Sequence, residues 1–356
     1  MKGCAVLFTN QEELPMYFIT IDCGTTNSRV YVVDETGKVY AKATKKVGVR
    51  NTSMTGSRDC LRDGLRETVN RAIEESGLDP KEIKAILSSG MITSEIGLCE
   101  LPHVMAPCDV DRLAANIAKV DVGITDYDIP VYFVRGIKNI MPAVVEDPFA
   151  LVGNTDFMRG EETQIAGLLA QGFQGPATVT VLSSHTKFIP VDEKGAILGS
   201  LTTTSGQVRE AILKETFVGK SVEKRDHVEE KPEGYFDENI VQQATRWIQQ
   251  AGIVRCMMFP RFLDVLLDTK WYERELFFDA LIAAEDMLAI GQLNDFDEAC
   301  KKNFVFVGLP TRCKLYEYIV KTVMPEATVS SICETAKVDS LSIDGILNIV
   351  KKAGIF

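Results

Sequence analysis

The sequence has no basic cluster and fewer basic than acidic residues. It holds 39 lysines and arginines against 50 aspartates and glutamates, for a formal net charge of −11. Nucleic acids and anionic membrane surfaces repel such a chain unless a local basic patch compensates. The nearest candidate patch, residues 42–46, fits the exposed edge of a strand. We therefore expect neither a nucleic acid nor a membrane as a partner.

Paired cysteines and long apolar runs are also missing. The nine cysteines are scattered without any CxxC pair, which favours free thiols in a reducing compartment over a disulfide framework or a zinc site. No apolar run reaches the length of a membrane span. Residues 1–15 have neither the basic flank nor the long apolar core of a secretory signal. These absences predict a cytoplasmic protein.

Two segments of the chain repeat one pattern. In residues 17–46 and 177–204, apolar residues alternate with period two around a hydroxyl-rich turn, and an Asp-Glu-x-Gly turn follows. The offset from Asp34 to Asp192, 158 residues, also aligns Thr25 with Ser183, Thr26 with Ser184, Arg29 with Lys187 and Gly37 with Gly195. A single offset, without a gap, therefore aligns both the hydroxyl-rich turn and the Asp-Glu-x-Gly turn of one segment with those of the other.

The repeat predicts a duplicated domain. Each copy reads as a three-stranded meander, and the chain is long enough for two domains. Either hydroxyl-rich turn alone would be ordinary turn chemistry. As a pair, they indicate two tight turns on either side of a cleft, where backbone N–H groups and hydroxyls hold an anion such as a phosphate chain.

Two motifs carry a resemblance to known proteins. Residues 22–27, Asp-Cys-Gly-Thr-Thr-Asn, resemble the first phosphate motif of the actin, Hsp70 and sugar-kinase superfamily, and residues 183–187 stand where the second motif lies. The heptapeptide MRGEETQ at 158–164, with the strand 85–97 and the His-x-Lys of the second turn, resembles the 2-dehydro-3-deoxygalactonokinase family. The resemblance runs from about residue 17 to the C-terminus. Ser183 and Ser184 depart from the family's glycine and threonine, so a hydroxyl replaces a close backbone approach there.

The resemblance implies an α/β fold of two actin-like ATPase domains, of the ribonuclease H type, each built as βββαβα, with a central cleft. We expect an N-terminal domain over residues 17–170 and a C-terminal domain over 171–356. Periodicity predicts a helix over 58–75 ending at Gly77, a strand over 84–87 and a helix from Glu161 to a stop at Gly172. It also predicts a surface loop over 218–239, about three helices over 239–293, a strand through Gly308 into a helix, and a final amphipathic helix.

The resemblance also implies an activity. The family uses ATP and Mg²⁺ to phosphorylate the C6 hydroxyl of 2-dehydro-3-deoxy-D-galactonate, a step of galactonate catabolism. Asp22 is expected to hold Mg²⁺ through its waters, or else to cap its turn. Phosphate donors are expected at two turns. The adenosine is expected at a third turn, whose alternative interpretation is an ordinary βα unit with a glycine at its turn. The expected donors are Gly24, Thr25, Thr26, Ser183, Ser184 and Lys187, and the adenosine turn holds Gly308.

A base must accept the proton of the sugar hydroxyl, and a carboxylate suits this role. Glu161 and Glu162 are the candidates, although acids at a helix start are favourable by themselves. Consecutive helical residues point about 100° apart, so only one faces the cleft; we choose Glu161. Arg159 is expected to grip the substrate carboxylate with two hydrogen bonds.

Further candidates for substrate contact are Asn27, Arg29 and Gly90. Lys187 reads equally well as a solvated strand residue, and His185 is left out of catalysis as a turn histidine.

Three alternatives stay open at this point. A kinase of the same fold could act on another sugar acid or sugar. A repressor of the superfamily would need a helix-turn-helix, for which about sixteen residues before the first strand leave no room. An activator of radical dehydratases would bind an iron–sulfur cluster, against which the dispersed cysteines argue. The oligomeric state also stays open, a homodimer included.

Overall fold

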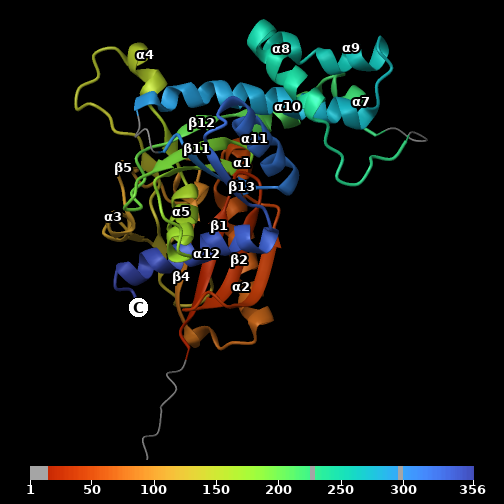
Figure 1. Cartoon of the computed structure of the whole chain (residues 1–356). Helices are drawn as coiled ribbons and strands as arrows, with labels where there is room; N and C mark the ends of the chain where they lie inside the picture. The colour runs from red at the N-terminus through yellow and green to blue at the C-terminus, as the bar shows by residue number, and fades with distance from the viewer. Residues whose placement is uncertain (1–14, 225–228, 296–299) are drawn as a thin grey trace, which may run out of the picture. The chain divides into compact units, whose positions relative to one another are not determined.

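The computed structural model describes residues 15–224, 229–295 and 300–356. The prediction about a secretory signal concerns residues 1–15 and so falls almost wholly outside this part. Contacts divide the chain into two compact units, which Figure 1 shows coloured along the chain. One unit comprises Met1–Leu101 and Ala118–Val134, and the other comprises Pro102–Ile117 and Arg135–Phe356.

The first unit is built on a six-stranded sheet in the order β3-β2-β1-β4-β7-β6. Its first three strands form the predicted antiparallel meander, and β4 runs parallel to β1. The strands are β1 Tyr17–Cys23, β2 Ser28–Asp34, β3 Val39–Lys45, β4 Ile83–Gly90, β6 Ala118–Lys119 and β7 Val131–Phe133. The helices are α1 Val49–Thr55 and α2 Asp59–Ser76, with 3₁₀ turns at Pro80–Glu82 and Met91–Thr93.

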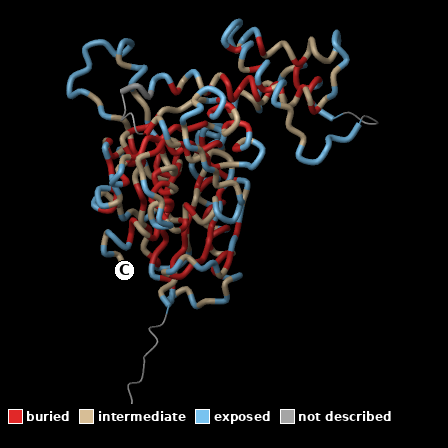
Figure 2. Tube along the Cα trace, viewed as in Figure 1, coloured by how far each residue is buried: buried red, intermediate tan, exposed pale blue. Residues whose placement is uncertain are grey.

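Helix α2 covers this sheet through a stripe of apolar residues. Leu61, Leu65 and Val69 recur at helical spacing and are fully buried against the strands. Gly77 ends the helix in the left-handed conformation, with its N–H bonded to the carbonyl of Glu74. The predicted helix and the strand that follows it are confirmed. Figure 2 shows the buried residues gathered along the strands.

The second unit holds a five-stranded sheet in the order β12-β11-β10-β13-β14 and a small sheet in the order β5-β8-β9. Its strands are β5 Val104–Met105, β8 Ile137–Lys138, β9 Phe157–Met158, β10 Ala177–Leu182, β11 Thr186–Val191, β12 Leu201–Thr203, β13 Asn303–Gly308 and β14 Thr328–Ile332. Its helices are α3 Val110–Ala114, α4 Pro148–Leu151, α5 Glu161–Ala170, α6 Ser205–Glu215, α7 Gly219–Val222, α8 Glu238–Cys256, α9 Phe259–Val265, α10 Trp271–Ala289, α11 Pro310–Val323 and α12 Thr335–Lys352, with 3₁₀ turns at Val152–Asn154 and Ile290–Asp295.

The two larger sheets repeat the same pairing. In each, three strands form an antiparallel meander, and a strand from later in the chain runs parallel to the first. The order βββαβα is complete only in the second unit. After β4 of the first unit, the described residues form a 3₁₀ turn and short strands where the expected helix would lie.

The two Asp-Glu-x-Gly turns form the same hydrogen bonds. Asp34 Oδ1 accepts the backbone N–H groups two and four residues later, at 2.9 and 3.1 Å, and Asp192 Oδ1 does so at 2.8 and 2.8 Å. Gly37 and Gly195 have φ of 86° and 85°, a conformation that favours glycine. The predicted duplication is confirmed at this turn.

The gapless offset is wrong in one detail. Cys23 pairs with Ser28 across a loop of residues 24–27, whereas Leu182 pairs with Thr186 across a loop of residues 183–185. The second loop is therefore one residue shorter. The offset of 158 holds from the second strand of each meander onward, and the first strands are shifted by one residue.

Helix α5 packs closely against α12. An added Cβ at Gly167 would lie 2.0 Å from the carbonyl oxygen of Leu341, and one at Gly345 would lie 1.7 Å from that of Thr163. Only glycines permit so close a crossing. The contact places α5 in the second unit, so the compact units differ from the predicted division after residue 170.

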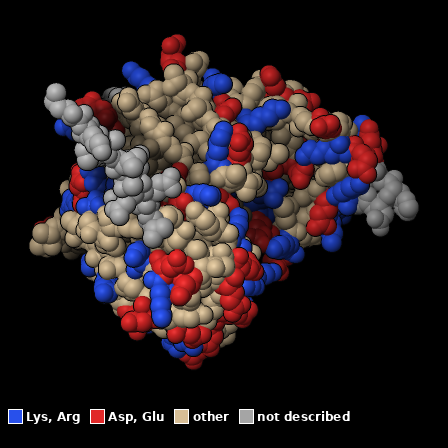
Figure 3. Space-filling view, turned by 90° about the horizontal axis from the view of Figure 1, so that it is seen from below, with Lys and Arg blue, Asp and Glu red and all other residues tan. Residues whose placement is uncertain are grey.

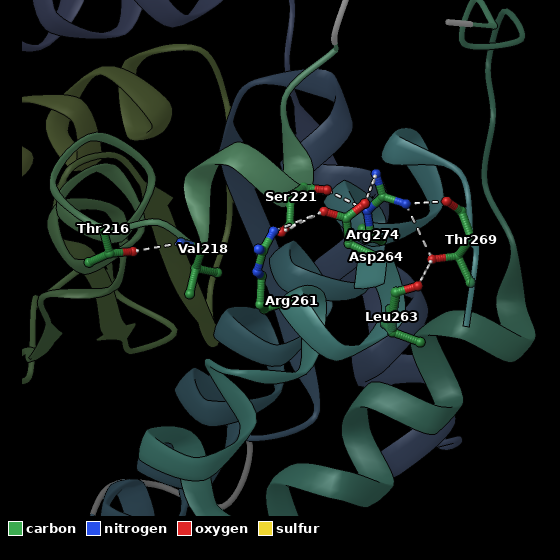
Figure 4. Close-up of polar contacts among 8 residues, drawn as sticks. All are labelled: Thr216, Val218, Ser221, Arg261, Leu263, Asp264, Thr269 and Arg274. Atoms are coloured by element: carbon green, nitrogen blue, oxygen red, sulfur yellow. Dashed lines mark hydrogen bonds and ion pairs between the residues drawn. The ribbon is translucent and has the colours of Figure 1, made fainter. Parts of the chain in front are cut away.

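The predicted surface loop over residues 218–239 contains a buried helical turn. In α7, Ser221 is fully buried and its hydroxyl donates to Asp264 at 3.0 Å. Figure 4 shows Arg274 of α10 at the centre of this network, bonded to the carbonyls of Ser221 and Thr269 and paired with Asp264 at 3.3 Å. The lysines and glutamates of this segment obscured the turn in the sequence.

The described surface is mixed in charge. On the face drawn in Figure 3, acidic and basic side chains alternate. Within the part of the chain that the structure describes, no helix is both long and apolar enough to span a bilayer. The described cysteines form no disulfide, and among the described residues no group of three or more His, Cys, Asp or Glu side chains is placed to bind a metal.

Candidate active site

Backbone N–H groups at the start of α1 hold the loop between β1 and β2. The N–H of Arg50 donates to the carbonyl of Thr25 at 2.9 Å, and that of Val49 donates to the carbonyl of Gly24 at 3.3 Å. At Gly48 a Cβ would lie 2.5 Å from the Thr25 oxygen. The loop carbonyls are thus used within the protein, an arrangement compatible with an anion on the N–H and hydroxyl side.

The loop between β10 and β11 has the same support. The N–H of Gln207 donates to the carbonyl of Ser184 at 2.9 Å. A Cβ at Gly206 would lie 2.3 Å from the carbonyl oxygen of Ser183. Arg312, in the first turn of α11, holds the same Ser183 carbonyl at 2.7 Å.

Sequence reasoning missed these supports. Gly206 lies 158 residues after Gly48, so the offset of the repeat contained the signal. Nothing in the sequence pointed to Arg312, which reaches the loop from a helix more than a hundred residues later.

Gly90 and Gly308 occupy equivalent positions in the two sheets. Each lies beside the last residue of the neighbouring parallel strand, Cys23 for one and Leu182 for the other. A Cβ at either glycine would lie 2.9 Å from that residue's carbonyl oxygen. Close backbone approach explains both glycines, whether or not a ligand contacts them.

Asp22 and Arg29 face each other across the first hairpin. The guanidinium Nη1 lies 3.1 Å from the carboxylate Oδ2, and the side chains are 47% and 38% exposed for Arg29 and Asp22 respectively. The pair lies one residue away from the strand ends that flank the loop of residues 24–27. Arg29, predicted to contact substrate, is thus next to the carboxylate predicted to hold the metal.

Glu161 and Glu162 begin α5 but differ in environment. Glu162 is fully buried, and both of its carboxylate oxygens accept from the N–H of Gly160, at 2.9 and 2.8 Å. Burial raises the pKa of Glu162 to about 8, and the charge of Glu161 adds to the rise. Glu161 is half-buried. Glu162 therefore closes the helix start, whereas Glu161 is partly exposed as a residue but has its Oε2 buried.

Arg159 lies in a close cluster with His103 and Gly136. A guanidinium nitrogen of Arg159 lies 3.5 Å from His103 Nδ1. A Cβ at Gly136 would lie 2.2 Å from the carbonyl of Met158 and 2.6 Å from Cγ of Arg159. Sequence reasoning missed His103 and Gly136, since nothing in their local pattern connects them with residue 159.

Lys187 is not a solvated strand residue, which was one of the two interpretations of this position. It is 8% exposed, and its ammonium donates to the carbonyl of Phe157 at 2.8 Å and to the hydroxyl of Thr202 at 2.7 Å. Two of its three donors are used within the protein. His185 in the adjoining loop is half-buried, and burial with the charge of Lys187 lowers its pKa.

The predicted residues group by unit. Residues 22, 24–27, 29 and 90 lie at one end of the first sheet, where β1, β2 and β4 begin or end. Residues 159, 161, 162, 183, 184, 187 and 308 belong to the second unit. Each unit thus carries its own loop with a glycine-supported backbone, and the second also carries the Arg-Gly-Glu-Glu segment.

Comparison with known proteins identifies relatives of this chain. A model of the 2-keto-3-deoxy-galactonokinase family matches residues 22–346. A protein of Rhizobium meliloti (strain 1021), named "Probable 2-dehydro-3-deoxygalactonokinase DgoK1", is 26% identical over 210 residues, or 59% of this chain. The match spans 60% of that relative's own length.

A solved structure supplies the fold comparison. The crystal structure of a candidate 2-dehydro-3-deoxygalactonokinase from Sinorhizobium meliloti superimposes with a TM-score of 0.70 at 18% identity, covering 94% of this chain and 98% of that one. At this identity the likeness shows the fold alone. With the repeated sheets, it confirms the predicted α/β fold of two actin-like units.

Proposed function

Because the chain belongs to the 2-keto-3-deoxy-galactonokinase family, we propose that it transfers the terminal phosphoryl group of ATP to the C6 hydroxyl of 2-keto-3-deoxy-D-galactonate. The products are ADP and the 6-phosphorylated sugar acid. The observation that carries this proposal is the Arg159-Gly160-Glu161 segment at the start of α5, where a guanidinium and the carboxylate of a half-buried glutamate are two residues apart.

The two hairpin loops supply the phosphate contacts in this proposal. Their carbonyls are bound by the starts of α1 and α6, and this favours N–H groups and hydroxyls as the groups that meet the ligand. Gly308 begins the turn that meets the adenosine. The contributing residues are Gly24, Thr25 and Thr26 in one loop and Ser183 and Ser184 in the other.

Asp22 fits a magnesium ion held through water. A single partly exposed carboxylate suits an ion that keeps most of its hydration shell, and no cage of several carboxylates is required. When bound, Mg²⁺ neutralises phosphate charge. Arg29, which now pairs with Asp22, would be placed to contact anionic ligand groups, and Asn27 and Gly90 lie at the same end of the sheet.

Glu161 is the base in this proposal, and Arg159 is the carboxylate-binding group. Glu161 accepts the proton of the C6 hydroxyl as its oxygen bonds to phosphorus. Arg159 offers two parallel N–H donors to the C1 carboxylate, a geometry that an ammonium lacks. Burial keeps Glu162 from this role, since its oxygens face the Gly160 N–H.

A coupled ADP-release assay across 2-keto-3-deoxy sugar acids and neutral hexoses tests the proposal. We expect turnover with 2-keto-3-deoxy-galactonate and a strong preference for acids over hexoses. Activity on neutral hexoses alone would refute the acid-specific assignment. Glu161→Gln should lower kcat by at least about a hundredfold, the lower range for a general base, while the Kd for ATP stays within twofold. If Glu162→Gln does this instead, the roles within the pair are reversed.

A further inference from the structure

Lys187 lies on β11, in the second hairpin, yet its ammonium reaches a segment thirty residues earlier. The acceptor is the carbonyl of Phe157, at 2.8 Å, and Phe157 is two residues before Arg159. The side chain is 8% exposed. An ammonium withdrawn this far from water needs good acceptors in place of its hydration, and these acceptors are therefore held firmly.

A second acceptor fixes the same segment from the side. Lys187 Nζ donates to Thr202 Oγ1 at 2.7 Å, and Thr202 Oγ1 in turn donates to Asp156 Oδ1 at 2.8 Å. The same Asp156 oxygen accepts the N–H of Phe157 at 2.6 Å. Lys187 and Thr202 thus bind both sides of the peptide that enters the Arg-Gly-Glu-Glu segment.

On the N-terminal side of Arg159, the N–H of Asn139 also donates to the carbonyl of Asp156 at 2.9 Å, and the side chain of Met158 is buried. Strand β9 consists of Phe157 and Met158 alone, paired with the two residues of β8. Gly160 follows at φ 110°, a conformation accessible chiefly to glycine. A two-residue strand is a weak anchor by itself, so the bonds from Lys187 and Thr202 add to the contacts that hold the backbone just before Arg159.

We propose that Lys187 is a positioning residue, which fixes the backbone that carries Arg159 and Glu161. It thereby sets the geometry of the sugar-acid site and leaves ATP binding to other groups. This inference rests on the proposed function for its kinetic consequences, but the anchor itself is a property of the fold. It replaces the sequence-based expectation that the ammonium binds phosphate.

The test compares four variants. Lys187→Met keeps an unbranched side chain one atom shorter and removes the donors, and Lys187→Arg restores donors in a different geometry. Thr202→Val removes the second acceptor without changing its shape. Lys194→Met is the matched control, because Lys194 is an exposed lysine on the turn that follows β11.

Kinetics and nucleotide binding are measured separately. In Lys187→Met we expect KM for the sugar acid to rise and kcat to fall, each by about tenfold, as expected for sub-ångström to ångström misplacement of reacting groups. The Kd for a non-hydrolysable ATP analogue should change less than twofold. Thr202→Val should shift both constants in the same direction by a smaller factor, Lys187→Arg should recover part of the loss, and Lys194→Met should match the wild type.

Hydrogen exchange tests the anchor without reference to catalysis. Amides in a peptide covering residues 157–163 should exchange faster in Lys187→Met and Thr202→Val than in the wild type and in Lys194→Met. If the wild type phosphorylates no sugar acid, the proposed function fails, and this measurement still decides the anchor. If Lys187→Met does not fold, Thr202→Val decides both questions.

Two results would overturn the inference. The first is a weakened ATP affinity in Lys187→Met with an unchanged sugar-acid KM, which would show that the ammonium contacts phosphate. The second is unchanged exchange at residues 157–163, which would show that the two bonds do not hold the segment.

Discussion

Both carboxylate oxygens of Glu162 accept hydrogen bonds from the backbone N–H of Gly160, at 2.9 and 2.8 Å. The glutamate therefore folds back over the start of its own helix, in a site without exposure to solvent. Its neighbour Glu161 remains half-buried. Two identical neighbours in sequence thus differ: Glu162 completes the helix start, and Glu161 is the one that we propose as the base.

The first prediction concerns pH. Burial raises the pKa of Glu162 from its ordinary 4.5 to about 8, so the folded chain binds the proton more tightly than the unfolded chain does. This contribution to the free energy of unfolding is complete below pH 4.5 and is lost as pH rises through 8. Glu162→Gln should flatten the decline in stability between pH 5 and 8, measured by urea denaturation. Glu193→Gln, on an exposed turn, is the control; equal slopes in wild type and Glu162→Gln would contradict the assignment.

The second prediction concerns Gly136. A Cβ there would lie 2.2 Å from the carbonyl of Met158, so Gly136→Ala must displace the backbone just before Arg159. We expect a loss of about 1–3 kcal/mol in the free energy of unfolding, the usual range for overpacking, together with a higher KM for the sugar acid. Gly153→Ala is the matched control, because a Cβ at that position meets nothing within 4 Å. Equal KM values for the two variants would count against the close packing.

The third prediction concerns the glycines beneath the two loops. Gly48→Ala and Gly206→Ala would place a Cβ 2.5 and 2.3 Å from the carbonyls of Thr25 and Ser183 respectively. Each should weaken ATP binding by about tenfold or more, since each displaces a loop that we propose donates to phosphate. Titration calorimetry with an ATP analogue measures this effect. Gly291→Ala, where a Cβ meets nothing within 4 Å, should bind as the wild type does, and normal binding by both loop variants would remove the loops from the site.

The fourth prediction concerns the helical part of the second unit. Arg274 and Arg261 both pair with Asp264, at 3.3 and 3.4 Å, but their side chains are 6% and 39% exposed. Arg274→Met leaves the carbonyls of Ser221 and Thr269 without this donor and removes the buried partner of Asp264, and should lower the free energy of unfolding by about 3–5 kcal/mol. Arg261→Met should cost at most about 1 kcal/mol. Thermal or urea unfolding of the two variants compares them directly, and similar losses would contradict the buried network.

Local patterns in the sequence were sufficient to predict the repeated framework. Period-two alternation and the Asp-Glu-x-Gly turns fix both meanders, because strand pairing and glycine conformation act over a few residues. Helix α2 and its stop at Gly77 follow from local rules as well. The one-residue difference between the loops was missed, since alignment by residue type does not register how the flanking strands pair.

The supports of the site depend on contacts distant in sequence. Arg312 reaches Ser183 across 129 positions, and Lys187 reaches Phe157 across 30. Neither bond leaves a trace in the local pattern. The different environments of Glu161 and Glu162 were likewise beyond local rules, because which of two adjacent acids is buried depends on packing around α5. The assignments of individual residues to ligands remain predictions.

The crossing of α5 and α12 has a consequence for the order in which the chain folds. Thr163, two residues after the proposed base, contacts Gly345, so the helix that carries Glu161 acquires its packing partner only once α12 has been made. During synthesis on the ribosome, the Arg-Gly-Glu-Glu segment emerges long before this partner. A chain truncated or stalled before α12 would therefore expose the apolar side of α5.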